Sequence, residues 1–226
     1  MSRIPPPERS STDRETISEL TTGRLSVYLR CLAFLESQGQ KTVSSQAMAD
    51  RFHLNSAQIR KDLACFGEFG TRGVGYDVQR LKRQLVETLG LNRTRTVLIV
   101  GAGNLGTALA DYAGFNTNGF HIVALIDTDP SKTGRTSRQG IPVHPWDHLQ
   151  TIVRRDRVDI GIIAVPAEGA QTVYDALTDA GVQAILNFAP VQLKLRPNVK
   201  VKSVDLRINL ESLSFHLKNV EEGNFS

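Results

Sequence analysis

The residues that could do chemistry begin at a glycine-rich turn. Four aliphatic residues, Val97-Leu98-Ile99-Val100, lead directly into Gly101-Ala102-Gly103-Asn104-Leu105-Gly106, which has the spacing G-x-G-x-x-G. The first glycine permits a tight turn, the second lets backbone N–H groups approach a pyrophosphate, and the third lets a helix pack closely on the strand. The pattern therefore predicts a dinucleotide-binding turn, with the N-terminus of the following helix directed at the phosphates.

A carboxylate follows at the spacing that such a site needs. The apolar run Ile122–Ile126 ends in Asp127, about twenty residues after the turn, where a carboxylate can bind the hydroxyls of an adenosine ribose. Asp129 lies beside it and no basic residue follows directly, so a 2′-phosphate would be repelled and NAD(H) is favoured over NADP(H). A glycine-rich turn that binds nothing is the alternative, and the agreement of strand, turn, helix and acid argues against it.

Strands and helices alternate through the rest of this region. Strands are predicted at 141–143, 159–165 and 184–186, and helices at 146–153 and 168–180. This alternation predicts an α/β fold with a doubly wound, Rossmann-like parallel sheet. Ligands of such sheets lie at the carboxyl ends of the strands, so Val165, Pro166 and the segment Asn187-Phe188-Ala189-Pro190 are expected to line the nicotinamide half of the site.

No side chain in these positions is a good general acid or base. His144, which follows a predicted strand, is the best candidate, but no carboxylate stands in an obvious position to orient it. The segments after the nucleotide core are also too short for a substrate domain. We therefore expect no catalytic residue, although a small NAD-dependent oxidoreductase and a CoA-binding module remain alternatives.

The residues before this region predict a helix-turn-helix. Leucines at steps of three and four predict a first helix from Gly23 to Gly39, and Ser44 or Ser45 is expected to cap a second helix that ends at Phe52. A third helix is predicted from Ala57 to Phe66, capped by Asn55 or Ser56. Three helices with a short turn between the last two are typical of this DNA-binding motif.

The third helix has one apolar face and one that suits a DNA groove. Ile59, Leu63 and Phe66 form the expected buried stripe. Arg60 and Lys61 fall on the opposite face, between the small side chains of Ala57 and Ala64. Small residues let the helix approach the groove floor while the cations reach bases or phosphates, and Ser56 and Gln58 could add hydrogen bonds. The alternative is that the two cations are ordinary surface charges.

A glycine-rich segment at 67–76 predicts a β-wing after the third helix. Arg72 falls at the expected tip of the hairpin, where it could enter a minor groove or bind phosphate, and Tyr76 closes the segment. A fourth helix is predicted from Val78 to Leu89. The predicted DNA-binding residues are Ser56, Gln58, Arg60, Lys61, Arg72 and Tyr76.

Composition and charge agree with a DNA-binding protein of two domains. The chain has 226 residues, of which 40% are hydrophobic and 22% charged, and a formal net charge of +4. Most of that excess lies before residue 91. No apolar run approaches the length of a membrane span, so a cytoplasmic location is expected. Cys31 and Cys65 lack the spacing of a disulfide framework or a zinc site, and we expect buried thiols, with a thiol sensor as the alternative.

The domain boundaries follow from these segments. We expect a disordered tail over residues 1–22, a winged-helix domain over 23–90, a Rossmann domain over 91–204 and a C-terminal helix with its tail over 205–226. In the last segment, apolar residues recur at steps of four and three, at Leu206, Leu210, Leu213, Leu217 and Val220. Such a seam suits a partner helix in a homodimer, or alternatively the chain's own sheet.

From Gly23 to Lys218 the sequence resembles the Rex family of redox-sensing transcriptional repressors. The stretches that carry the resemblance are Tyr28-Leu29-Arg30, Ile59–Leu63, Phe69–Tyr76, Gly101–Gly106, Leu109–Tyr112, Asn187–Pro190 and Val204-Asp205-Leu206. The resemblance implies a homodimer that binds a palindromic operator and senses NADH over NAD⁺, with its C-terminal helix swapped into the partner. It also implies a network of Arg30, Tyr112 and Asp205 that joins the DNA domain, the nucleotide site and the swapped segment.

The charge of the cofactor provides a physical reason for such sensing. NAD⁺ carries a cationic pyridinium ring, whereas the ring of NADH is neutral. An apolar pocket formed by residues such as Phe188, Pro190 and Leu206 would prefer NADH, because desolvating an unpaired charge costs several kcal/mol. The charge of the ring predicts a preference for NADH, and the resemblance to the Rex family implies that NADH then releases a repressor from its operator.

Overall fold

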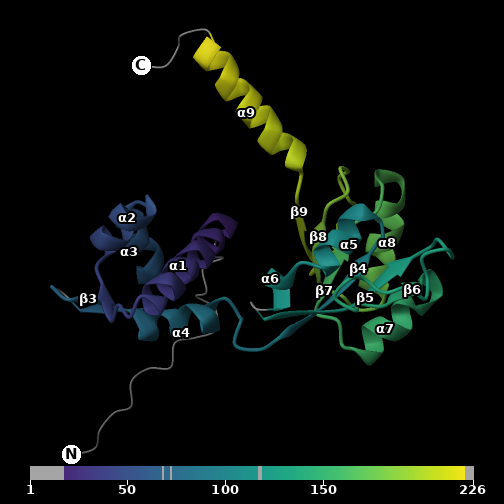
Figure 1. Ribbon diagram of the computed structural model, residues 1–226, viewed down its shortest axis with the longest axis horizontal. Coiled ribbons are helices and arrows are strands. Elements are labelled where there is room, and N and C mark those ends of the chain that lie inside the picture. The colour runs from purple at the N-terminus through teal and green to yellow at the C-terminus, as the bar shows by residue number, and fades with distance from the viewer. Residues whose placement is uncertain (1–17, 68, 72, 117–118, 222–226) are drawn as a thin grey trace, which may run out of the picture. The chain divides into compact units, whose positions relative to one another are not determined.

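The structure is a computed structural model that describes residues 18–67, 69–71, 73–116 and 119–221. The chain divides between Asn92 and Arg93 into two compact units, each with its own hydrophobic core (Figure 1). The division falls two residues after the expected boundary at residue 90. Residues 1–17 of the predicted tail lie outside the described residues.

The first unit contains four helices and three short strands among its described residues. The helices are α1 (Glu19–Ser37), α2 (Ser45–Phe52), α3 (Ser56–Ala64) and α4 (Val78–Thr88), and the strands are β1 (Thr42–Val43), β2 (Gly70–Thr71) and β3 (Gly75–Asp77). The strands form an antiparallel sheet in the order β1-β3-β2. This is the arrangement of a winged helix.

The first helix corrects the predicted extent of the tail. α1 begins at Glu19, because the hydroxyl of Ser18 accepts a hydrogen bond from Thr21 N and caps the helix there. Residues 19–22 are therefore helical and do not belong to a disordered tail. Gly23 lies within α1, so it is not the first residue of the helix.

Side-chain caps set the start of the two helices of the helix-turn-helix. The hydroxyl of Ser44 accepts from Ala47 N at 3.0 Å, and Asn55 Oδ1 accepts from Gln58 N at 2.9 Å. Between them, His53 takes a left-handed conformation with φ of 53°. α3 ends at Ala64 and not at Phe66, because the chain tightens into i→i−3 hydrogen bonds at residues 65 and 66.

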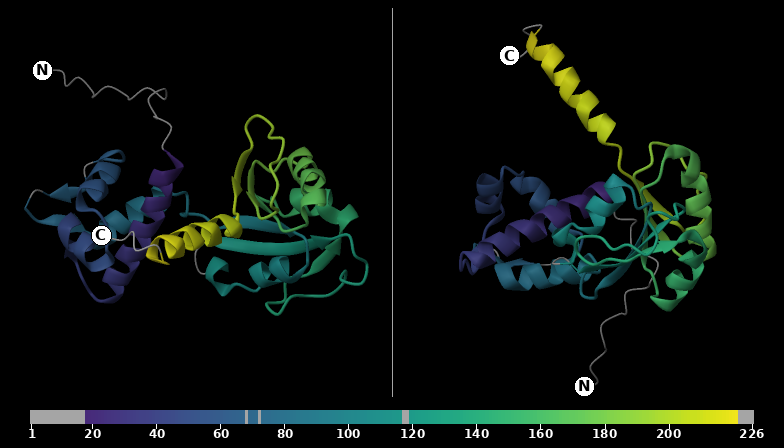
Figure 2. Two further views of the ribbon diagram at one scale, coloured as in Figure 1. Left: turned by 90° about the horizontal axis from the view of Figure 1, so that it is seen from above. Right: turned by 45° about the vertical axis from the view of Figure 1, so that its right-hand side comes forward.

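The second unit is a doubly wound sheet of six parallel strands, flanked by helices (Figure 2). Its strands are β4 (Arg95–Val100), β5 (Phe120–Asp127), β6 (Val143–Pro145), β7 (Ile160–Ile163), β8 (Ala184–Asn187) and β9 (Lys200–Ser203). Its helices are α5 (Asn104–Ala110), α6 (Ala113–Asn116), α7 (Leu149–Arg155), α8 (Ala167–Asp179) and α9 (Leu206–Glu221), with a 3₁₀ turn at Trp146–His148. The strand order β6-β5-β4-β7-β8-β9 reverses between β4 and β7, which is the order of a dinucleotide-binding fold.

Alternate residues of the central strand point to opposite faces of this sheet. Leu98 and Val100 belong to the core cluster that includes residues of α7 and α8. Val97 and Ile99 belong to the cluster on the other face, which includes Ala110 of α5. Both faces are covered by helices, so β4 is buried on both sides, as its unbroken aliphatic sequence predicts.

The last helix stands apart from this packing. No residue of α9, drawn in yellow in Figure 1, is buried within the described chain. Its large apolar side chains are 53% to 67% exposed. They lie at Leu206, Ile208, Leu210, Leu213, Phe215, Leu217 and Val220. The predicted seam therefore does not pack on the chain's own sheet. Among the described residues, no helix is both long and apolar enough to cross a membrane.

Candidate nucleotide cleft and DNA-recognition surface

Two glycines of the glycine-rich turn are required by the fold itself. Gly101 has φ of +105°, and a Cβ at this residue would lie 2.8 Å from the carbonyl carbon of Ala164. A Cβ at Gly106 would overlap the carbonyl oxygen of Gly101. The turn can therefore form, and α5 can pack beneath it, only when neither residue has a side chain.

Gly103 is different, because the protein's own atoms leave room for a side chain there. A Cβ at this residue would meet nothing within 4 Å, and its φ of −80° is open to any residue. Neither strain nor packing explains this glycine. A ligand that approaches the backbone closely does explain it, so the cradle fits the pyrophosphate of a dinucleotide.

Asp127 is held at the end of β5 by three donors. Its Oδ2 accepts from Ala102 N at 2.7 Å and from Lys132 Nζ at 3.1 Å, and its Oδ1 accepts from Asp129 N at 2.8 Å. Burial, which leaves the side chain 9% exposed, raises its pKa, but the donors outweigh burial and the pKa lies below its ordinary value. Asp127 thus ties the glycine-rich turn to β5 as an ionised carboxylate.

Lys132 is a neighbour of the Asp127 carboxylate that was not predicted from the sequence. No basic residue follows Asp129 directly in the sequence, but the loop folds back and brings Lys132 Nζ within 3.9 Å of Asp129 as well. A 2′-phosphate would therefore meet one cation that was left out of the prediction from the sequence, although the two carboxylates still outnumber it. The aspartate-rich turn at 127–131 is the signal for such a fold-back, because Asp129 Oδ1 accepts from Ser131 N and tightens the loop.

A cavity of about 640 Å³ opens at the carboxyl ends of β4, β5 and β7. It is lined by Val100, Gly101, Gly103, Ile126, Asp127, Thr128, Asp129, Lys132, Trp146, Ala164, Val165, Pro166, Gly169, Thr172 and Val173. Of the predicted cofactor-binding residues, Gly101, Gly103, Asp127, Val165 and Pro166 are among them. Trp146 and Thr172 were not predicted, since neither belongs to a recognisable motif.

The predicted nicotinamide segment does not line this cavity. Asn187 is fully buried: its Nδ2 donates to the carbonyl of Ala189 at 3.1 Å, and its Oδ1 accepts from Ala189 N at 2.9 Å. Phe188 packs against the core, whereas Pro190 is exposed and Leu206 is 62% exposed. Asn187 thus shapes the bend after β8 and leaves the exposed residues beyond it free to contact a ligand.

The candidate base, His144, lies on the edge strand β6 and is not among the cavity residues. Burial, and then the neighbouring His148, lower the pKa of its imidazole. The two rings are 6.0 Å apart. No group of three or more metal-ligating residues is found among the described residues.

The exposed face of α3 carries the predicted cations. Arg60 and Lys61 are exposed, and Arg60 Nη1 donates to the hydroxyl of Ser45 on α2 at 3.0 Å. Ser56 is half-buried at the start of the helix. Tyr76 is half-buried and packs against the core of the unit, where burial raises its pKa. Arg72 lies outside the described residues.

A buried ionic network behind α3 was not predicted. Asp62, which is 2% exposed, accepts hydrogen bonds from Arg24 and Tyr28 of α1. Arg24 lowers the pKa of this carboxyl, against the opposing effect of burial. Gln58, one of the predicted DNA-binding residues, also donates to it, through Nε2 at 2.7 Å. The sequence signal for this network was Asp62 itself, a charged residue beside the apolar stripe of α3.

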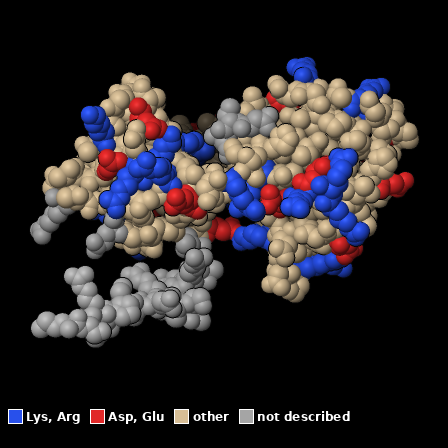
Figure 3. All heavy atoms as spheres, turned by 90° about the horizontal axis from the view of Figure 1, so that it is seen from below, with Lys and Arg blue, Asp and Glu red and all other residues tan. Residues whose placement is uncertain are grey.

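Basic side chains do not form one continuous patch on the face displayed in Figure 3. On both units, Lys and Arg side chains are interspersed with Asp and Glu. With a formal net charge of +4 over 226 residues, the overall charge adds only a small attraction to a polyanion.

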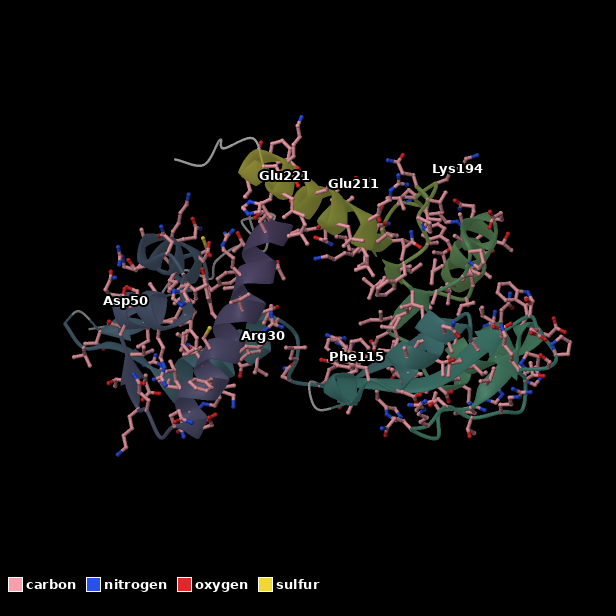
Figure 4. The ribbon with its side chains drawn as sticks, turned by 45° about the horizontal axis from the view of Figure 1, so that its top comes forward. Arg30, Asp50, Phe115, Lys194, Glu211 and Glu221 are labelled. Atoms are coloured by element: carbon pink, nitrogen blue, oxygen red, sulfur yellow. The ribbon has the colours of Figure 1, made fainter. Side chains whose placement is uncertain are left out.

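The residues of the implied switch network belong to different units. Arg30 is exposed on α1 in the first unit (Figure 4). In the second unit, Tyr112 is 59% exposed and its ring lies edge-on to Phe115, with the centroids 5.0 Å apart. Asp205 Oδ1 accepts from Arg207 N at 2.9 Å and caps the start of α9. Each of the three is thus on the surface of its own unit.

Comparison with known proteins agrees with this two-unit organisation. A family described as "CoA binding domain" matches residues 92–191, and one described as "Putative DNA-binding protein N-terminus" matches residues 16–64. The redox-sensing transcriptional repressor Rex of Carboxydothermus hydrogenoformans is 51% identical over 202 residues, which are 89% of this chain and 97% of the relative. The Rex of Desulfitobacterium hafniense is 49% identical over 89% of this chain and 95% of its own. The chain belongs to the Rex family.

Solved structures extend the agreement to the fold. A crystal structure of RSP with beta-NAD⁺ and operator DNA matches with a TM-score of 0.87 at 35% identity, over 92% of this chain and 95% of that chain. RSP with beta-NADH matches with a TM-score of 0.81 at 34% identity, over 92% of this chain and 97% of that chain. The expected fold class is confirmed, and the relatives are named as repressors and not as enzymes.

Proposed function

We propose that the chain is a homodimeric repressor that binds a palindromic operator through α3 and releases it when NADH occupies the cleft. Nucleotide binding is supported above all by the unfilled space at Gly103, where a Cβ would meet no protein atom within 4 Å. The ionised carboxylate of Asp127 lies at the same turn. The Rex-family structures with NAD⁺, NADH and operator DNA support the same pairing of ligands.

Each part of the nucleotide has a proposed set of partners. The glycine-rich turn (residues 101–106) would hold the pyrophosphate, and Asp127 would hold the adenosine ribose. Val165 and Pro166, which line the cavity, and the exposed Pro190 would contact the nicotinamide, whereas the buried Asn187 and Ala189 would shape the bend that positions Pro190. The bound nucleotide supplies a ring whose charge depends on its oxidation state, and the chain supplies a site that distinguishes the two charges.

The proposed preference for NADH follows from the cost of burying charge. The segment around the predicted nicotinamide site offers Phe188, Pro190 and Leu206, and none of these carries a negative charge that could neutralise a pyridinium cation. Desolvating an unpaired cation costs several kcal/mol. Moving a protein from about 99% DNA-competent to 99% incompetent needs roughly 5.5 kcal/mol of differential binding. The two quantities are of the same order, so cofactor charge suffices to drive the change.

The proposed dimer links nucleotide binding to DNA binding. A helix-turn-helix protein reads two half-sites at a fixed spacing, which requires two-fold symmetry. The seven exposed apolar side chains of α9 need a partner surface, and a second copy of the chain would provide it. NADH would then favour a dimer in which the two recognition helices, α3 and its copy, no longer match adjacent major grooves. We also propose that the protein acts in the cytoplasm, where operator DNA and NADH meet.

The test is a competition on a protein–DNA complex. A fluorescent operator, selected from random DNA with the full chain, is bound until its anisotropy saturates, and NADH, NAD⁺ or CoA is then titrated. NADH is expected to release the DNA at concentrations at which NAD⁺ does not. Equal effects of NADH and NAD⁺ would contradict redox sensing, and release by CoA alone would favour a CoA-binding module.

A further inference from the structure

The carboxylate of Asp62, on the buried side of α3, accepts hydrogen bonds from three side chains, those of Arg24, Tyr28 and Gln58. Arg24 donates to both oxygens, with Nε 2.6 Å from Oδ2 and Nη2 2.7 Å from Oδ1. The hydroxyl of Tyr28 donates to Oδ2 at 2.9 Å. The amide nitrogen of Gln58 donates to Oδ1 at 2.7 Å, one helical turn away along α3.

This arrangement fixes which end of the Gln58 amide faces inward. A guanidinium that holds both oxygens keeps Asp62 ionised, and an ionised carboxylate can only accept hydrogen bonds. If the amide of Gln58 turned over, its Oε1 would face the carboxylate oxygen of Asp62 and the two would repel. The Nε2 group must therefore face Asp62, which directs Oε1 away from the core.

Gln58 lies where a recognition helix meets bases. It is the third residue of α3, half-buried, at the border between the stripe that contains Asp62 and the exposed face that carries Lys61. Residues at the N-terminal end of such a helix contact base edges in the major groove. Among the described residues, Oε1 of Gln58 makes no hydrogen bond, so this acceptor is available to a ligand.

We propose that Gln58 is a specificity-determining residue whose carbonyl oxygen reads an exocyclic amino group in the operator, and that Asp62 is the positioning residue that orients it. In the major groove, adenine and cytosine present amino donors, whereas guanine and thymine present carbonyl acceptors. Gln58 therefore selects adenine or cytosine on the strand that it faces. This inference rests on the proposed function, because it requires α3 to enter the major groove.

The experiment removes one amino group at a time from the operator selected above. Each adenine is replaced by purine and each cytosine by 2-pyrimidinone, and affinity is measured with the wild-type chain and with Gln58→Leu. One position in each half-site is expected to lose affinity by about 3- to 10-fold in the wild-type complex. At that position the same replacement is expected to cost Gln58→Leu less than about 2-fold, because the interacting partner is gone.

Gln46→Leu is the matched control. Gln46 makes the same i,i+4 hydrogen bond as Gln58, from its Nε2 to Asp50 Oδ1 at 2.7 Å, but on α2. This variant is expected to leave the penalty at the sensitive position unchanged. The proposal is overturned if no amino-group penalty depends on Gln58.

Asp62→Asn tests the positioning role. An asparagine amide can donate as well as accept, so the amide of Gln58 is free to turn over and the penalty for removing the amino group is expected to fall towards 1-fold. An unchanged penalty in a folded Asp62→Asn protein would contradict the role of Asp62. The comparison of the wild-type chain with Gln58→Leu tests the base preference, and it does not depend on the result for Asp62→Asn. A wild-type chain that selects no DNA would refute the proposed function, whereas one that binds an operator with no Gln58-dependent amino group refutes this inference alone.

Discussion

The α-carbon of Gly106 lies so close to the carbonyl oxygen of Gly101 that a methyl group on Gly106 would overlap that oxygen. The turn and the first turn of α5 are thus packed against each other through bare backbone. Gly103 lies between them in the sequence, and a methyl group at this residue would meet no protein atom within 4 Å. Gly106 is therefore required by the fold, whereas the proposed role of Gly103 is to leave room for a ligand.

This difference predicts opposite effects of the same substitution. Gly106→Ala is expected to destabilise the second unit by more than about 1 kcal/mol, because overpacking moves the backbone. Gly103→Ala is expected to leave the melting temperature of the nucleotide-free protein within about 2 °C, yet to weaken NADH binding, because the methyl group occupies the space of the pyrophosphate. Calorimetry and an NADH titration separate the two, and unaltered NADH affinity in Gly103→Ala would remove the phosphate role from this turn.

A second prediction concerns Asp127. Asp127→Ala is expected to weaken NADH binding by roughly 10- to 100-fold, since a hydrogen bond to a charged group contributes about 1.5–3 kcal/mol. Asp129→Ala removes a neighbouring carboxylate that is 44% exposed and is expected to cost less than about 3-fold. Isothermal titration of both variants provides the comparison. Similar affinities for the two would show that Asp127 does not bind the ribose.

A third prediction separates DNA binding from nucleotide binding. Arg60→Ala and Lys61→Ala are expected to weaken operator binding and to leave NADH affinity unchanged, because both side chains lie on the exposed face of α3. Loss of a phosphate contact reduces the slope of log K against log salt by about 1. Arg154→Ala, which removes an exposed cation from α7 in the other unit, is the control for net charge. Operator affinity that matches this control would rule out both cations as DNA contacts.

The buried network predicts a dependence of stability on pH. The pKa of Asp62 is lowered in the folded state, so its stabilising contribution is complete above its unfolded value near about 4 and is lost as the pH falls through the folded value. Between pH 5 and 3, the melting temperature of the first unit should therefore fall less in Asp62→Asn than in the wild type. Other carboxylates are common to both proteins and cancel in this difference, so parallel curves would contradict the argument.

Tyr28 tests the same network at neutral pH. Tyr28→Phe removes one donor from the buried Asp62 carboxylate and keeps the ring in the core, so we expect a loss of about 1–3 kcal/mol in the free energy of unfolding. Tyr112→Phe, whose ring is exposed, serves as the control. Denaturant titration measures both losses, and equal losses would mean that the Tyr28 hydroxyl contributes little.

The last prediction concerns the exposed apolar face of α9. The double variant Leu210→Glu/Leu217→Glu is expected to behave as a monomer in light scattering and to lose most of its operator affinity, because charge on this seam prevents burial against a partner. Ser214→Glu places the same charge beside the seam and is expected to remain a dimer. A dimeric double variant would assign the dimer interface to another surface.

The elements that follow from regular patterns could be predicted from the sequence, and those that depend on long-range contacts could not. The central strand and the glycine-rich turn were evident, because each is determined by its own neighbours. Each cap of the helix-turn-helix was narrowed to two candidates, Ser44 or Ser45 and Asn55 or Ser56, and the structure shows Ser44 and Asn55 as the caps. β9 was missed because its alternation of Lys and apolar residues is too short to stand out, and it forms only by pairing with β8. The contacts of Asp62 with Arg24 join residues 38 apart, so the charged residue beside the apolar stripe of α3 indicates a buried partner without identifying it.

The isolation of α9 within one chain has a consequence for how much active repressor a cell obtains from a given gene dosage. A newly made subunit on its own would expose an apolar helix to water. Until it meets a second subunit, this helix would be open to proteolysis and to aggregation with other chains. Pairing is second order in subunit number, so halving the output of the gene would lower the amount of paired regulator by more than half whenever subunits are scarce. Control of the target genes would then be lost abruptly as expression declines.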